Sequence, residues 1–135
     1  MTRSLDQKKR GLGLLAFVFA ASVLMCQAGE KKMTMHKNAK AMKQEIAKQI
    51  PIGSNIKDAK RIMEANGFKC KLEEQGSFAE MGKDERFVRR HDNVDFLYCD
   101  KEKGGFICSR RWQIAIVHKD DIVSDIFVSI SQTCP

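Results

Sequence analysis

The sequence predicts an α+β fold in which one or two N-terminal helices precede a roughly four-stranded antiparallel meander held by two disulfides. Apolar residues recur at helical spacing up to about residue 66, whereas from Phe68 onward they alternate with polar residues as in strands. Four cysteines follow an N-terminal segment that has the plan of an export signal. An even number of cysteines in a small exported chain is typical of a disulfide framework.

Residues 1–28 are predicted to be a secretory signal peptide. Basic residues precede the apolar run Gly11–Met25, which is shorter than the ~20 residues that a membrane-spanning helix needs. Cleavage before Gly29 is favoured because Ala28 ends a small-x-small site. The alternatives are an uncleaved anchor and lipidation of Cys26, where Met25 interrupts the lipobox. We expect an exported protein, periplasmic or secreted, with a membrane anchor only if one of these alternatives holds.

The positive charge of the chain lies outside its predicted folded domain. The formal net charge is +7, of which +3 belongs to the signal segment and +4 to residues 29–48, so the remainder is neutral. Duplex nucleic acid requires a basic face on the folded part. The short runs Arg89-Arg90 and Arg110-Arg111 are instead typical of solvated surface. We therefore expect no nucleic-acid partner.

Residues 29–50 are predicted to form a basic amphipathic helix or linker ahead of a single α+β domain at residues 51–135. The lysines of this segment lie between apolar residues at helical spacing, which are Met35, Ala39, Met42, Ile46 and Ile50. Such a helix can lie on an anionic membrane surface through residues 31–48. More often it docks on its own domain or spaces that domain from an anchor, and these interpretations are favoured.

A second helix is predicted between the break at Pro51-Ile52-Gly53 and a C-terminal Gly67. Ser54 or Asn55 can cap its first turn, where Asp58 complements the helix dipole. Gly67 is expected in the left-handed position that follows many helices, with Phe68 packing back on the last turn. The apolar face consists of Ile56, Ala59 and Met63.

Four strands are expected after this helix, the first at residues 68–72 and the second at residues 94–99. Gly104-Gly105 marks the turn into the third strand, and a charged turn near residues 119–123 leads to the fourth. Residues 73–93 are mostly polar or charged, so they are interpreted as a long surface loop.

Packing can decide the register of the last two strands, because a slip of one residue turns every side chain to the other face. One register places three apolar residues opposite three others: Trp112, Ile114 and Ile116 face Ile130, Val128 and Ile126. A shift by one residue mixes polar side chains among them. The apolar register also sets Cys108 opposite Cys134, and therefore predicts a disulfide between these two cysteines.

By elimination, Cys70 and Cys99 would form the second disulfide and join the first strand to the second. A bond between Cys99 and Cys108 across the glycine turn is the competing pairing, since four cysteines allow three connectivities. The cysteine spacing contains no Cys-x-x-Cys motif and no paired zinc ligands. The cysteines are therefore interpreted as structural.

The sequence indicates no catalytic, cofactor or metal site. The histidines, His36, His91 and His118, lie in separate predicted elements and form no ligand cluster. The acidic pairs Glu73-Glu74 and Asp120-Asp121 are typical of solvated charges. No phosphate-binding glycine loop is present. We expect a protein that is not an enzyme and that carries no cofactor.

The stretch IGSNIKDAKRIMEANG carries a resemblance to a known family. Gly53, Ser54, Ala59 and Met63 fall where the SmpA/OmlA (BamE-like) envelope lipoproteins and the related β-lactamase-inhibitor-protein repeat place a glycine, a small polar cap and apolar helix positions. The chain resembles these proteins over roughly residues 50–131. Gly67 comes about one helical turn later than in the family pattern. The resemblance implies helices followed by an antiparallel sheet, with roles in outer-membrane assembly or protein binding.

These expectations combine into one functional hypothesis. The chain is predicted to be an exported, non-catalytic module that binds an envelope or secreted protein, with its sheet or residues 73–93 as the contact surface. The alternative is a membrane-associated structural envelope protein, anchored through lipid on Cys26 or through the basic helix.

Overall fold

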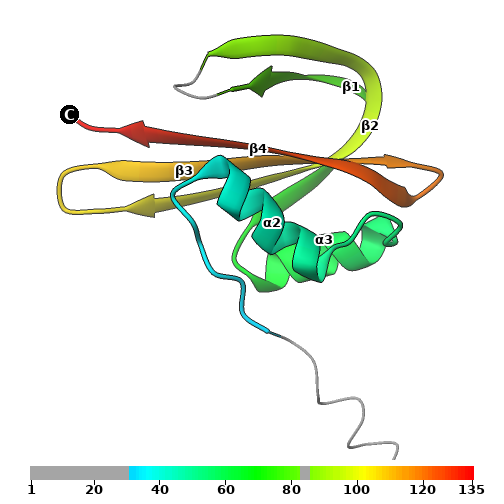
Figure 1. Ribbon diagram of the computed structural model, residues 1–135, viewed down its shortest axis with the longest axis horizontal. Helices are drawn as coiled ribbons and strands as arrows, with labels where there is room; N and C mark the ends of the chain where they lie inside the picture. Colours follow the sequence, from blue (N-terminus) through cyan, green and yellow to red (C-terminus); the bar gives the residue numbers. More distant parts are fainter. Residues whose placement is uncertain (1–30, 83–85) are drawn as a thin grey trace, which may run out of the picture. The chain divides into compact units, whose positions relative to one another are not determined.

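The computed structural model describes residues 31–82 and 86–135, and residues 33–135 form one compact unit. The elements follow in the order α2 (Ala39–Gln49), α3 (Ile56–Ala65), β1 (Lys69–Met81), β2 (Phe87–Gly104), β3 (Ser109–Lys119) and β4 (Ile122–Thr133) (Figure 1). The strands form one antiparallel sheet in the order β1-β2-β3-β4. The predicted α+β class and the antiparallel meander are confirmed.

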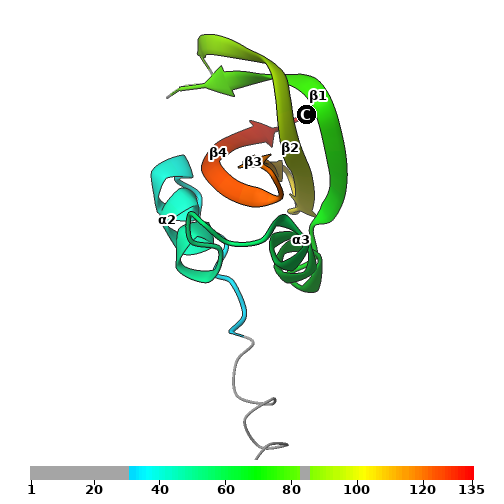
Figure 2. The same cartoon turned by 90° about the vertical axis from the view of Figure 1, so that its right-hand side faces the viewer.

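The predicted signal peptide, residues 1–28, lies outside the described residues, and so does Cys26. Within the described ranges, no helix combines the length and the apolar character that crossing a membrane requires. Both helices of the described unit lie on one face of the sheet (Figure 2). The core lies between them and the strands, and it contains buried side chains from α2, α3, β2, β3 and β4.

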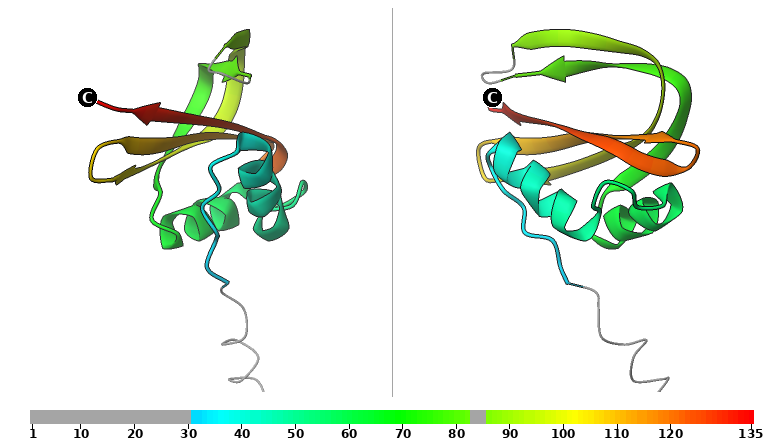
Figure 3. Two further views of the ribbon diagram at one scale, coloured as in Figure 1. Left: turned by 60° about the vertical axis from the view of Figure 1, so that its left-hand side comes forward. Right: turned by 45° about the vertical axis from the view of Figure 1, so that its right-hand side comes forward.

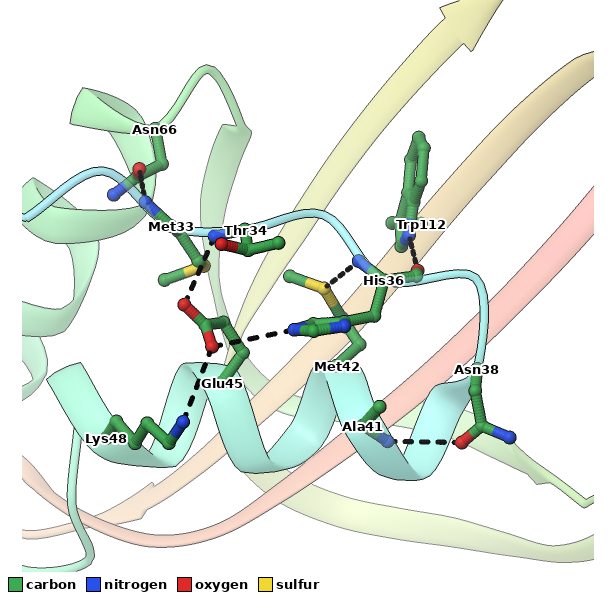
Figure 4. A network of polar contacts seen from close by, with 10 residues as sticks. All are labelled: Met33, Thr34, His36, Asn38, Ala41, Met42, Glu45, Lys48, Asn66 and Trp112. Carbon is green, nitrogen blue, oxygen red and sulfur yellow. Dashed lines mark hydrogen bonds and ion pairs between the residues drawn. The ribbon is translucent and has the colours of Figure 1, made fainter.

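Helix α2 packs its apolar face into this core. Met42, Ile46 and the following Ile50 are completely buried, whereas the lysines of the helix are exposed. Asn38 caps the helix through its side-chain oxygen, which accepts the N–H of Ala41 at 3.1 Å (Figure 4). The helix therefore docks on the sheet. Its buried side chains belong to the same core as those of α3 and the strands.

The segment ahead of α2 is also tied to the fold (Figure 4). The N–H of Met33 donates to the side-chain oxygen of Asn66 at 2.8 Å, and the indole N–H of Trp112 donates to the carbonyl of His36 at 2.8 Å. Glu45 of α2 accepts the N–H of Thr34 at 3.1 Å. These contacts hold residues 33–36 between α3 and β3.

Helix α3 begins and ends as the sequence predicts. Asn55 is the capping residue, and its side-chain oxygen accepts the N–H of Lys57 at 2.8 Å. Gly67 has φ +87°, a left-handed conformation in which glycine carries no Cβ penalty. Phe68 is buried and donates its N–H to the carbonyl of Met63 at 3.1 Å, which closes the last turn.

The predicted register of β3 and β4 is confirmed. Trp112, Ile114 and Ile116 lie opposite Ile130, Val128 and Ile126, respectively. Cys108 and Cys134 form a disulfide with their Cα atoms 4.3 Å apart. Asp120 and Asp121, with φ of 51° and 65°, make the tight turn between the strands.

The prediction of a long surface loop at residues 73–93 is wrong. β1 continues to Met81 and β2 already begins at Phe87. We call the distal part of this hairpin, residues 76–82 and 86–94, the β1–β2 arm. Cross-strand and neighbouring ion pairs offset its charges: Arg89 lies 2.8 Å from Glu80 and Arg90 lies 2.8 Å from Asp92. Irregular pairing breaks the alternation of side chains, which conceals the strand pattern in the sequence.

The other two cysteines are a close pair. Cys70 and Cys99 lie opposite each other on β1 and β2, and their Sγ atoms are 2.8 Å apart. The structure thus contains one disulfide and one neighbouring pair of cysteine thiols. The competing bond between Cys99 and Cys108 does not form, because Cys108 is already joined to Cys134.

Candidate binding cleft

The β1–β2 arm curls over the face of the sheet that lies away from the helices (Figures 2 and 3). The pairing of β1 with β2 shifts at two places around Gly76, and both Gln75 and Asn93 have positive φ, 48° and 54°. Bulges of this kind bend a strand and increase its twist. The curl therefore arises from local irregularity in both strands of the hairpin.

Gly76 allows the bend to close on an aromatic ring. A Cβ atom at this position would lie 3.0 Å from ring carbon Cε1 of Phe96, tighter than most Cβ contacts, so the ring would have to shift. Phe96 is buried on the inside of the curl. The missing side chain of Gly76 thus provides the space in which Phe96 packs beneath the arm.

Aromatic contacts join the arm to β4. The ring of Phe78 lies 4.7 Å from that of His91 and 5.2 Å from that of Phe127 between centroids. His91 is itself 4.8 Å from Phe127, and Phe96 completes the cluster at 5.1 Å from Phe78. Rings at these separations attract one another beyond the area that they bury. The arm is therefore held over the sheet by side chains that are far apart in the sequence.

Glu80 is the acidic group of the arm's inner side. Its carboxylate lies 2.9 Å from Nε2 of His91 and accepts a hydrogen bond from Nε of Arg89 at 2.8 Å. Hydrogen bonds from His91 and then from Arg89 lower the pKa of Glu80. Glu80 consequently remains a carboxylate, and it holds His91 against the phenyl rings.

A cavity of about 640 Å³ lies between the arm, β4 and the N-terminal end of α2. This volume is in the range of natural ligand pockets, about 300–1,000 Å³. Its lining combines aromatic rings, small polar groups and two lysines: Phe78, Tyr98, Phe127, Gln113, Ser129, Ser131, Lys40 and Lys43. We call this space the cleft. Such a mixture is suited to binding, with rings for apolar contact and polar groups for orientation.

Two polar pairs give the cleft defined edges. The side-chain amide of Gln113 donates to the hydroxyl of Tyr98 at 2.7 Å across β2 and β3. Lys43 lies 3.7 Å from Asp125, with its Nζ 5.8 Å from the centre of the Phe127 ring. The cleft thus has a neutral floor and a basic rim on the side of α2.

The residues predicted as sites lie elsewhere. Neither the four described cysteines nor the three histidines line the cleft. His91 lies behind its wall, where it contacts the lining residues Glu80 and Phe78. In the part of the chain that is described, no three side chains of His, Cys, Asp or Glu gather as a metal site would require. One signal in the sequence could have predicted this hairpin. Phe78 and Glu80 alternate along β1 just as their partners, His91 and Arg89, alternate along β2.

Comparison with known proteins assigns no function to the cleft. No family model, curated protein or solved structure matches this chain. The resemblance to the SmpA/OmlA (BamE-like) family therefore stays a prediction, and the function rests on the geometry of the site itself.

Proposed function

We propose that this protein is an exported, non-catalytic protein-binding module of the cell envelope, and that the cleft is its contact surface. The observation that carries the proposal is a cavity of about 640 Å³ between the arm, β4 and the N-terminal end of α2, walled by aromatic rings of the arm and of β4. Aromatic side chains gathered in a concave site are the commonest anchors of protein interfaces.

The position of β4 favours an extended segment as the bound part of the partner. β4 is an edge strand, and past Val123, which pairs with Gly53 and Ser54, its outer edge has no strand partner among the described residues. An extended segment can add to such an edge through main-chain hydrogen bonds, while alternate side chains enter the adjoining pocket. Here that pocket is the cleft.

The alternative, a membrane-associated structural envelope protein, has less support from the described residues. The apolar face of α2 packs into the core, so only its lysines are available to an anionic surface. Binding through residues 31–48 would then be electrostatic, without insertion of the helix. Anchoring by lipid on Cys26 would act independently of this helix.

We also propose that Cys70 and Cys99 form the second disulfide in the exported protein. Their Sγ atoms are 2.8 Å apart, and paired strands already hold the two residues opposite each other. The two thiols would lose two protons and two electrons to a disulfide-bearing oxidoreductase of the export compartment, which is reduced to its dithiol as the S–S bond forms.

Site-directed photocrosslinking tests the proposed contact surface. A photoreactive residue is placed at Ser129, which lines the cleft, and in a matched variant at Ile52, which is exposed on the loop between the helices. Irradiation of envelope fractions is expected to give one discrete protein adduct from position 129 and none from position 52. Equal adducts from both positions, or none from either, would contradict the proposal.

A cleft-filling substitution then tests whether the same partner needs the cavity. Ser129→Trp places a large ring in the cleft, whereas Ile52→Trp adds the same ring to an exposed loop. We expect Ser129→Trp to weaken binding of the crosslinked protein by about tenfold or more, with Ile52→Trp unchanged. Unchanged affinity in a folded Ser129→Trp protein would place the partner elsewhere.

A further inference from the structure

The β2–β3 hairpin projects past the helices (Figures 1 and 3). Its turn carries the two most exposed large apolar side chains of the described residues: Phe106 is 104% exposed and Ile107 is 66% exposed. We call Gly104–Cys108 the hairpin tip. Neither side chain contributes to the core, so folding gives no reason for a phenyl ring at this position.

Two cations stand directly behind the tip. Lys103 of β2 and Arg110 of β3 are cross-strand partners, an arrangement in which like charges repel. Arg110 donates to the side-chain oxygen of Gln132 at 3.1 Å, and within the described ranges neither cation forms an ion pair with a carboxylate. The fold therefore leaves a pair of neighbouring positive charges without a counter-ion of its own.

The same two cations border a hollow of about 230 Å³. Its other lining residues are Gly104, Gly105, Cys108, Ser109, Trp112 and Gln132. An apolar point and a basic hollow thus lie side by side at one end of the hairpin. Together they match the two chemical layers of an anionic membrane surface, apolar chains beneath charged phosphates.

The tip is fixed in shape. The Cys108–Cys134 disulfide joins its base to β4, and the N–H of Gly105 donates to the carbonyl of Cys108 at 2.8 Å. A Cβ at Gly105 would lie 2.8 Å from that same carbonyl oxygen, so the tight turn requires glycine. A fixed tip loses little conformational freedom on binding, which favours affinity.

We propose that the hairpin tip binds anionic phospholipid membranes. Phe106 and Ile107 enter the boundary between headgroups and acyl chains, and the hollow between Lys103 and Arg110 receives a headgroup phosphate. A membrane suits this surface, because its two exposed apolar side chains lie beside a cross-strand pair of cations that has no carboxylate partner among the described residues, which matches the acyl and phosphate layers of an anionic bilayer. This inference is independent of the cleft.

Vesicle binding tests the proposal on the chain beginning at Gly29. That form lacks the apolar segment of residues 1–28, which would itself bind lipid, and it contains the whole described core and the compact unit of residues 33–135. Vesicles of equimolar phosphatidylglycerol and phosphatidylcholine are compared with vesicles of phosphatidylcholine alone. Trp112, the single tryptophan, lines the hollow, so lipids brominated near the headgroup should quench its fluorescence.

Paired variants separate the tip from general surface effects. Phe106→Ser/Ile107→Ser and Lys103→Gln/Arg110→Gln are each expected to lower partitioning onto the anionic vesicles by about tenfold or more. The matched controls are Phe87→Ser/Val88→Ser, which removes exposed apolar residues from the arm, and Lys57→Gln/Lys69→Gln, which removes exposed lysines elsewhere. Both controls should bind as the unchanged chain does.

Four outcomes would overturn the proposal. These are no binding to anionic vesicles, equal binding to phosphatidylcholine vesicles, unchanged binding of either tip variant, and undiminished vesicle binding when inorganic phosphate saturates the hollow. Sedimentation of the lipid-free chain checks for self-association. A dimer that Phe106→Ser/Ile107→Ser dissociates would show that the tip instead contacts a second copy.

Discussion

At the scale of single residues, Gly76 controls how closely the arm approaches the sheet. Gly76→Ala would set a methyl group against the Phe96 ring, 3.0 Å from Cε1, and is expected to cost about 1 kcal/mol of unfolding free energy. Gly104→Ala is the matched control, since nothing lies within 4 Å of the place that its methyl group would take. Denaturant unfolding of both variants measures the difference, and equal stabilities would contradict the steric role of Gly76.

The cysteine pair is the second residue-scale feature. Contact between the two thiols lowers the pKa of Cys70 and raises that of the buried Cys99. If the proposed bond forms, the partly exposed Cys70 would be the thiol that attacks an incoming disulfide, and Cys99 would then resolve the mixed disulfide. We expect non-reducing peptide mapping of the exported protein to show Cys70 joined to Cys99. Alkylation of both residues without reductant would contradict this pairing.

The carboxylate of Glu80 stabilises the arm through its contacts with Arg89 and His91. Its pKa is lowered in the folded protein, so its contribution to stability is fully present above the unfolded pKa of a glutamate and is lost as the pH falls through the folded value. Glu80→Gln should therefore lower the melting temperature at neutral pH and have a vanishing effect at strongly acidic pH. Thermal unfolding across this range checks the prediction, and a pH-independent difference would contradict it.

At the scale of elements, the β3–β4 hairpin depends on its disulfide. The bond spans a sequence separation of 26 residues, and on the chain-entropy model such a loop is worth about 3 kcal/mol. Cys134→Ala should lose about this much stability under oxidising conditions, and reductant should remove most of the difference from the unchanged chain. Equal stabilities before reduction would show that strand pairing alone determines the hairpin.

The strands determine which face of helix α2 is buried. The spacing of Met42, Ile46 and Ile50 is compatible with a membrane surface as well as with the favoured docking on a protein core. The strands supply the second surface, and burial of all three side chains against it leaves the lysines to the solvent. The basic character of the segment is thus a property of its outer face.

At the scale of the whole molecule, the predicted cleavage of the N-terminal segment would decide whether the domain is anchored. We predict that the exported protein begins at Gly29, because Ala28 satisfies the soluble cleavage rule and Met25 breaks the lipid one. Intact mass spectrometry of protein recovered from the envelope or the medium measures this directly. A lipid-bearing N-terminal Cys26 would contradict the prediction and favour a membrane-held structural protein.

The sequence by itself determined the end of α3 at Gly67, the β3–β4 register and the Cys108–Cys134 bond, and it narrowed the N-cap of α3 to Ser54 or Asn55. These features depend on neighbours along the chain: Asn55 and Gly67 act within a turn of helix, and the hairpin has only one register that brings its apolar residues together. Local physics is therefore sufficient to predict them.

The tertiary structure alone decided the curl of the β1–β2 arm and the cleft beneath it. The apolar residues of the arm do not alternate regularly enough to predict a strand. Its bend depends on a contact between Gly76 and Phe96 that does not exist until the sheet forms. The cleft likewise joins Phe78 of β1 to Phe127 of β4 and to Lys40 of α2. These residues meet only because the sheet folds back on itself, and a contact between distant segments leaves no periodic signal in the sequence.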